Sequence, residues 1–240
     1  MSISSNGYEA VMFDLDGTLR HLPRSPVDLF FEFSADFGLT FDADSPLRLQ
    51  RWQHNYWADK ERVDADRILG EEKFWLEMLR KELRFLGVTE GVDSYASEIN
   101  ERFLDVFKNT KGILPADGAR TLRKLRELGY TIGLVSNRPE PLHEQVTELE
   151  LDGVFHFTLS AGEANSWKPD GGIFHQALAM AGTQAQAAVY VGDNYYVDVV
   201  GSRDAGLTPL LFDPENVFPA ADCDRIARIG EVLTWLERAE

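Results

Sequence analysis

A series of short apolar runs constrains the fold of this chain more than any other feature. The runs occupy residues 10–13, 131–135, 154–159, 188–191 and 207–212. Continuous apolar runs of this length are typical of strands that are buried on both faces. We therefore expect these segments to form the central strands of a sheet that is covered on its two sides.

Helical patterns alternate with these runs. They cover residues 117–128, 141–149, 172–181, 198–205 and 229–238. Strands that alternate with helices predict a doubly wound α/β core around a parallel sheet. Ligand sites in such sheets lie outside the carboxyl ends of the strands. Asp14, Ser136 and Asp193 all lie at the ends of predicted strands, so we expect them to share one site.

The segment from residue 21 to residue 110 has a different pattern. It has almost no β-branched runs, and four helices are predicted at residues 27–37, 46–59, 70–86 and 92–107. We expect an α-helical domain at residues 21–110, inserted after the first strand. The α/β core then comprises residues 1–20 and 111–240.

Aromatic side chains gather on two helices of this inserted segment. Trp52, Tyr56 and Trp57 fall near one helix face, and Phe74 and Trp75 lie on the next helix. Such stripes usually pack inside a helical domain. If some of them line a binding site instead, they favour a substrate with a flat or apolar part.

The charge balance limits the classes of partner. The chain carries 40 acidic and 24 basic residues, a formal net charge of -16. This charge repels nucleic acids and anionic membranes, so we expect neither as a partner. An anionic ligand needs a local cationic site or a metal ion.

Three features together predict a cytoplasmic protein: a single cysteine, no apolar run near the ~20 residues of a membrane span, and an N-terminus unlike a signal peptide.

An acidic pair follows the first predicted strand. Asp14 and Asp16 are two residues apart, and Gly17 indicates that the chain turns directly after them. Two neighbouring carboxylates can bind a hard cation such as Mg²⁺. They can also divide roles, with one ionised as a nucleophile and the other protonated as a general acid.

The acidic pair is part of a longer resemblance. Four segments are similar, in order, to the motifs of the haloacid dehalogenase-like superfamily: Phe-Asp-Leu-Asp-Gly-Thr-Leu at residues 13–19, Leu-Val-Ser-Asn at 134–137, Trp-Lys-Pro-Asp at 167–170 and Val-Gly-Asp-Asn-Tyr-Tyr-Val-Asp at 191–198. The resemblance covers essentially the whole core. It implies a Rossmann-like core with a helical cap after the first motif.

The resemblance also implies roles for individual residues. Asp14 is the expected nucleophile, which forms an aspartyl-phosphate. Mg²⁺ is expected on Asp14, on the backbone carbonyl of Asp16 and on Asp193. The Asp16 side chain then protonates the leaving oxygen and later activates water. Lys168 provides positive charge to the phosphate and to Asp14.

Further residues are expected to shape the phosphate pocket. Thr18, Ser136 and Asn137 are candidates for hydrogen bonds there, although Ser136 could instead cap the helix that follows it. The resemblance places Asp198 in support of the metal site or of Lys168, and direct metal contact stays open. Asp198 could also simply begin a helix, where the helix dipole favours a carboxylate. Gly17 and Gly192 are expected to allow close approach of the backbone.

The resulting hypothesis is a Mg²⁺-dependent phosphatase that acts on a small phosphorylated metabolite, as a monomer or homodimer. A phosphotransferase or mutase on sugar phosphates is the alternative, and a non-catalytic phosphometabolite-binding protein is a further one. Dehalogenation is disfavoured, because dehalogenases of this superfamily lack the second aspartate, here Asp16. Arg20, His21 and Arg138 lie beside the motifs and are candidate substrate contacts.

Overall fold

The computed structural model describes residues 7–108 and 110–238, and the chain divides into two compact units. One unit contains the chain up to His21 and from Gly112 onward, and the other is Leu22–Lys111. These limits differ by one residue from the predicted boundaries. Residues 1–6, 109 and 239–240 of the predicted segments lie outside the described residues.

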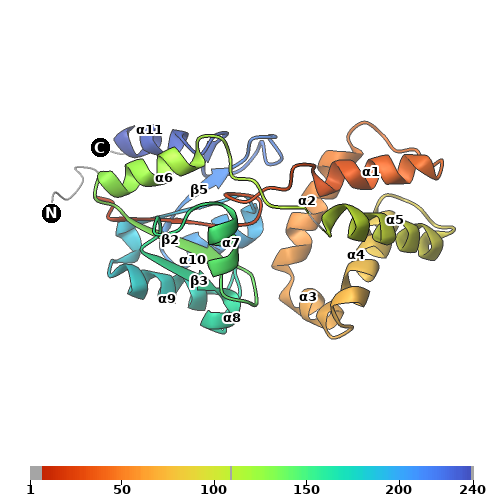
Figure 1. The fold of residues 1–240 in the computed structure, drawn as a ribbon, viewed down its shortest axis with the longest axis horizontal. Helices are drawn as coiled ribbons and strands as arrows, with labels where there is room; N and C mark the ends of the chain where they lie inside the picture. The colour runs from red at the N-terminus through yellow and green to blue at the C-terminus, as the bar shows by residue number, and fades with distance from the viewer. Residues whose placement is uncertain (1–6, 109, 239–240) are drawn as a thin grey trace. The chain divides into compact units, whose positions relative to one another are not determined.

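The first unit is built on one parallel sheet (Figure 1). Its strands are β1 (Ala10–Phe13), β2 (Thr131–Ser136), β3 (Phe157–Ser160), β4 (Ala188–Gly192), β5 (Thr208–Phe212) and β6 (Asp224–Ile226), in the order β3-β2-β1-β4-β5-β6. The chain therefore builds outward from β1 in one direction and then in the other. The predicted doubly wound α/β core is confirmed.

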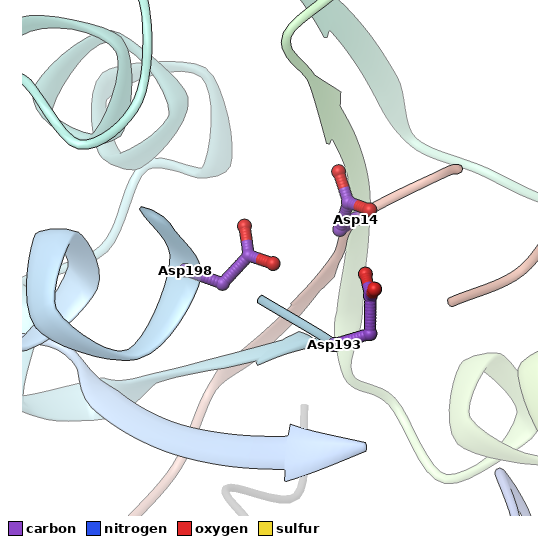
Figure 2. Close-up of side chains that lie close together, drawn as sticks. All are labelled: Asp14, Asp193 and Asp198. Atoms are coloured by element: carbon purple, nitrogen blue, oxygen red, sulfur yellow. The ribbon is translucent and has the colours of Figure 1, made fainter. Parts of the chain in front are cut away.

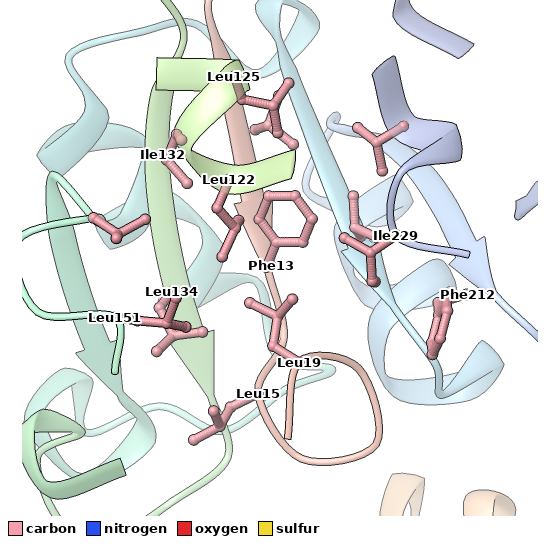
Figure 3. Packing of buried hydrophobic residues seen from close by; sticks show 14 of the residues in the cluster. Phe13, Leu15, Leu19, Leu122, Leu125, Ile132, Leu134, Leu151, Phe212 and Ile229 are labelled. Atoms are coloured by element: carbon pink, nitrogen blue, oxygen red, sulfur yellow. The ribbon is translucent and has the colours of Figure 1, made fainter. Parts of the chain in front are cut away.

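Helices cover both faces of this sheet. One face carries α6 (Gly118–Glu127), α7 (His143–Glu148) and α11 (Glu231–Arg238), and the other carries α8 (Ala161–Ala164), α9 (Gly171–Ala181) and α10 (Val200–Asp204). Successive residues of β1 alternate between the faces. Val11 and Phe13 pack with Leu122 on the first face (Figure 3), whereas Met12 packs with Phe174 on the second. This double coverage explains the unbroken apolar runs.

Two strands differ from the sequence prediction. β3 begins at Phe157 rather than at residue 154, because the Val154 N–H instead closes a turn onto the Leu151 carbonyl (3.0 Å). β6 was not predicted. It is short, and two of its three residues, Asp224 and Arg225, are polar and exposed at the edge of the sheet, so it lacks an apolar run.

The second unit is helical. Its helices are α1 (Pro26–Asp36), α2 (Ser45–Ala58), α3 (Lys60–Arg67), α4 (Glu71–Phe85) and α5 (Val92–Phe107). Four of them match the predicted segments. α3 was not predicted, since Val63 is the one apolar residue of this short helix that is buried and a single residue makes no periodic stripe. The Asp59 side chain caps α3 by accepting a hydrogen bond from the Arg62 N–H (3.1 Å).

Most aromatic side chains singled out in the sequence pack within this helical unit. Trp52 stacks on Tyr56 with ring centroids 5.6 Å apart, and Trp57 contacts Phe74 at 5.8 Å. Tyr56 is fully buried, as expected for core packing, while Trp75 remains 47% exposed.

A buried carboxyl group lies inside the helical unit. Glu82 on α4 is only 5% exposed, and its Oε1 accepts a hydrogen bond from Nε2 of Gln53 on α2 (2.8 Å). Burial raises the pKa of Glu82 to about 7, although the bond from Gln53 partly opposes this shift. The folded chain therefore holds this proton more tightly than the unfolded chain does.

We expect Glu82→Gln to stabilise the protein at alkaline but not at acidic pH. As pH rises from the unfolded value of 4.5 to about 7, the wild type loses stability, because the carboxyl group ionises in the unfolded chain while the buried one keeps its proton. The variant avoids this loss, so its advantage should grow to at most about 3 kcal/mol by pH 8. Urea unfolding at pH 5 and pH 8, followed by tryptophan fluorescence, measures the difference. The exposed Glu101→Gln is the control, and an equal advantage at both pH values would contradict the prediction.

Candidate active site

The first acidic residue lies where β1 ends and the chain turns. The Asp14 N–H donates to the Val191 carbonyl of β4 (2.8 Å), which extends the strand pairing to the site. Gly17 then has φ = +92°, a conformation that favours glycine. A Cβ atom there would lie 2.4 Å from Oδ2 of Asp193. Both the turn and the close approach predicted for Gly17 are present.

The Lys168 ammonium group is the buried centre of the site. Its side chain is 2% exposed, and Nζ donates to Oδ1 of Asp14 (2.6 Å), Oδ1 of Asp198 (2.7 Å) and Oη of Tyr190 (3.0 Å). Burial alone would lower the pKa of Lys168, but the attraction of the two carboxylates outweighs it and raises the pKa well above its usual value. Lys168 is therefore a fixed positive charge.

The end of β2 holds the Lys168 loop in place. The Asn137 side chain donates from Nδ2 to the Lys168 carbonyl (2.8 Å) and accepts from the Lys168 N–H (2.7 Å). Asn137 thus positions the lysine, and its contact with phosphate stays a prediction. Ser136 is buried at the last position of β2, opposite Ser160. The next helix is α7, with Leu142 at its N-cap, so the alternative that Ser136 caps it is wrong.

Three carboxylates of the site lie close together (Figure 2). Asp14, Asp193 and Asp198 each offer an oxygen, and these atoms all lie within 4.8 Å of one another. Burial raises the pKa of Asp14 to about 7. Burial is also the main cause that raises the pKa of Asp193 well above its usual range, and repulsion from Asp14 and Asp198 adds to it. The three carboxylates share one ammonium group, that of Lys168, so part of their negative charge stays uncompensated. Such a cluster of oxygen donors suits a hard divalent cation such as Mg²⁺. Thr18 donates to Oδ1 of Asp193 (3.2 Å), which helps to orient that donor.

Asp198 is already committed to protein groups. Its Oδ1 accepts from Lys168, and its Oδ2 accepts from the Asn194 N–H (2.9 Å). These contacts favour support of Lys168 over direct metal contact, which stays a hypothesis. A Cβ atom at Gly192 would lie 2.4 Å from the Asp198 carboxyl group, so this glycine allows the close approach that was expected.

The prediction that Asp198 begins a helix is wrong. It lies inside a π-helical turn, η2 (Tyr195–Val199), which precedes α10. Oδ1 of Asn194 caps this turn by accepting from the N–H groups of Tyr196 (3.0 Å) and Val197 (3.1 Å). Asp198 thus lies in the first turn of a helical stretch that starts three residues earlier than predicted, where the helix dipole favours a carboxylate.

The second carboxylate of the motif has different surroundings. Asp16 is 42% exposed in its side chain and accepts two bonds from Arg138, Nε to Oδ2 (2.6 Å) and Nη2 to Oδ1 (2.8 Å). Arg20 adds a longer bond to Oδ1 (3.3 Å). The hydrogen bonds to Asp16 are the main cause of a raised pKa of Arg138, and Glu140 and Asp14 add attraction. Arg20 and Arg138, candidate substrate contacts from the sequence, thus bind Asp16 here.

Tyr190 is a site residue that the sequence did not indicate. Its hydroxyl accepts from Lys168 and donates to the Val135 carbonyl of β2 (2.9 Å), while its ring packs edge-on against Phe174. It lies in the middle of an apolar run, and an aromatic residue there is typical of a core strand. Only the buried polar partner distinguishes it.

A family model of haloacid dehalogenase-like hydrolases matches residues 8–206, which include all the site residues described in this subsection. The chain belongs to this family. Among curated members, the haloacid dehalogenase-like hydrolase domain-containing protein 3 of Xenopus laevis is 30% identical over 149 residues, which cover 62% of this chain and 60% of that protein. The chain thus matches about 60% of the length of this relative and of the Bos taurus protein of the same name.

Another member of the family matches nearly end to end. The ribulose-1,5-bisphosphate 5-phosphatase of Halopiger xanaduensis is 27% identical over 227 residues, 91% of this chain and 90% of that protein. Solved structures of the family share the fold. A predicted phosphoglycolate phosphatase from Haemophilus somnus has a TM-score of 0.62 at 17% identity, covering 97% of this chain and 99% of that one. A 2-haloacid dehalogenase from Pseudomonas syringae has 0.57 at 24% identity, covering 97% and 100%.

Among the described residues, no helix is both long enough and apolar enough to cross a membrane.

We expect Mg²⁺ to stabilise the protein through Asp193. A saturating cation that binds only the folded chain should raise the melting temperature by roughly 5 °C or more, and chelator should reverse the shift. Asp193→Asn should abolish the shift and should itself raise the melting temperature in chelator, since it removes a half-buried charge that repels its neighbours. Differential scanning fluorimetry measures both effects, with the exposed Asp105→Asn as control. A full Mg²⁺ shift in Asp193→Asn would exclude this site.

Proposed function

We propose that the protein is a Mg²⁺-dependent hydrolase of a small phosphomonoester that acts through an aspartyl-phosphate on Asp14. The different surroundings of Asp14 and Asp16 carry this proposal. Asp14 is buried against a fixed positive charge, which suits a nucleophile, whereas Asp16 is accessible and can exchange a proton with substrate or water. The two carboxylates thus have different surroundings, which supports two different roles.

In the proposed mechanism, Asp14 and Asp16 take part in both half-reactions. An oxygen of Asp14 attacks phosphorus, the bond from phosphorus to the ester oxygen breaks, and Asp16 gives its proton to that oxygen. Asp16 then takes a proton from water, whose oxygen attacks phosphorus and releases phosphate, so that free Asp14 is restored. Lys168 holds Asp14 and balances charge on the transferred group throughout.

Mg²⁺ is the proposed cofactor of this site. When bound, it would neutralise the repulsion between carboxylate and phosphate. Asp14 and Asp193 would hold it through side-chain oxygens, together with the backbone carbonyl of Asp16. Asp198 would keep Lys168 in position, and the Ser136 hydroxyl and Thr18 would complete the pocket for the phosphoryl oxygens.

The names of the relatives support a small phosphorylated sugar or sugar-derived substrate. One acts by name on ribulose 1,5-bisphosphate, and another, from Pyrococcus abyssi, is named a glyceraldehyde 3-phosphate phosphatase and is 35% identical over 97 residues, 40% of this chain and 41% of that protein. The acidic chain with its single cysteine fits a cytoplasmic setting, which we include in the proposal.

Phosphate release from a panel of phosphorylated metabolites, with Mg²⁺ and with chelator, tests the proposal. Asp14→Asn should abolish release, because no covalent intermediate can form. Equal release by wild type and Asp14→Asn would refute the mechanism. Movement of phosphate within the substrate, without release, would identify a mutase, and binding without either reaction would identify a non-catalytic binding protein.

We expect Asp16→Asn to separate the two half-reactions. Loss of the general acid should slow release from an alkyl ester such as glycerol 3-phosphate by roughly 10²–10⁴-fold. The first-turnover burst of 4-nitrophenol from 4-nitrophenyl phosphate should persist, since this leaving group departs without a proton. Stopped-flow absorbance measures the burst, with the exposed Asp105→Asn as control. Loss of the burst would show that Asp16 is not primarily the acid.

A further inference from the structure

Arg138 directly follows the second motif and faces the proposed acid. Its guanidinium group binds both oxygens of Asp16 in a fork, and 30% of its side chain is exposed. This bidentate geometry is the one by which arginine recognises a free carboxylate or a phosphate. The fork that holds the Asp16 carboxylate thus has the geometry to hold another oxyanion.

The role proposed for Asp16 conflicts with this clamp. To protonate a leaving oxygen, Asp16 must carry a proton on one of the two oxygens that now accept from Arg138. The protonated group can no longer satisfy the fork on both sides. Asp16 must therefore leave the fork, at least in part, during each turnover.

The two arginines respond differently when Asp16 leaves. Arg20 keeps a second carboxylate partner, because its Nε donates to Oε2 of Glu148 (2.9 Å), and Glu148 also accepts from the Gly112 N–H (2.9 Å). For Arg138, every side-chain hydrogen bond to the part of the chain that the structure describes goes to Asp16. A guanidinium that loses the carboxylate to which it is hydrogen-bonded favours a new anion in the same place.

We propose that Arg138 forms an oxyanion subsite for the leaving group of the substrate, so that a carboxylate or second phosphate on that group displaces Asp16 from the fork and frees it to act as the acid. The inference rests on the proposed function for the placement, since the leaving oxygen must lie against Asp16 and hence near Arg138. It makes Arg138 a specificity-determining residue. The preferred substrates are phosphomonoesters with a second oxyanion a few bonds from the ester.

Three ligands with one carbon skeleton test the subsite. Glycerol 3-phosphate has an uncharged leaving group, 3-phosphoglycerate adds a carboxylate, and glycerol 1,3-bisphosphate adds a phosphate. Binding is measured by calorimetry with Mg²⁺, on full-length Asp14→Asn protein that cannot turn the ligands over. In this background Arg138→Gln should weaken the binding of at least one of the two anionic ligands roughly 10- to 100-fold. The affinity for glycerol 3-phosphate should change less than about threefold, and Arg138→Lys should lie between, because lysine keeps the charge without the fork.

Turnover by the otherwise wild-type chain separates specificity from structure. Arg138→Gln should raise KM for the anionic ester much more than KM for glycerol 3-phosphate, so that the ratio of the two kcat/KM values falls roughly 10- to 100-fold. The exposed Arg228→Gln removes the same charge elsewhere and serves as the control. An equal loss of kcat on charged and uncharged esters would show that Arg138 only orients Asp16, and would overturn the inference.

The turnover experiment tests the proposed function and the binding experiment tests the subsite, so either claim can be refuted without the other. If wild-type protein releases phosphate from none of the esters, the proposed function is weakened, but the calorimetric preference still decides the role of Arg138. If phosphate is released and binding shows no dependence of the charged ligands on Arg138, the subsite is refuted and the proposed function remains. Failure of all three ligands to bind also refutes the subsite.

Discussion

The buried ammonium group of Lys168 is the interaction on which the site depends. An isolated ion at this depth would be unstable, and it persists because Asp14, Asp198 and the hydroxyl of Tyr190 surround it. These partners come from the end of β1, from η2 and from β4, so one charge fixes three distant segments against each other. Loss of any one partner would leave a buried charge incompletely paired, so substitutions here are expected to lower stability as well as to alter the site.

The acidic pair shows how position gives two identical side chains different surroundings. Asp14 continues a central strand and is enclosed by neighbours, while Asp16 follows two residues later, just before the left-handed turn at Gly17, and reaches accessible guanidinium groups. Water can exchange a proton with the second carboxylate but has little access to the first. The turn therefore produces a chemical difference that the residue types alone do not contain.

The sequence predicted those parts of the molecule that have a local pattern. Buried strands leave apolar runs, and the four motifs carry Asp14, Lys168 and Asp193 in recognisable contexts. The unpredicted parts depend on long-range contacts. The clamp on Asp16 joins residues 122 positions apart, and the hydroxyl of Tyr190 gains a polar role only through its neighbours in space. Short elements without periodicity, such as α3 and β6, left no signal.

The connection between the two units has a consequence for how such a chain can change. His21 and Ile113 pair with each other through reciprocal backbone hydrogen bonds of 2.9 and 2.7 Å, so the inserted segment leaves and re-enters the core at adjacent points. Because its two ends are adjacent, the helical unit connects to the core in the same way as a short closed loop would. Its length and surface can therefore change without moving the strands of the core, which leaves the sheet free to keep its geometry while the inserted unit varies.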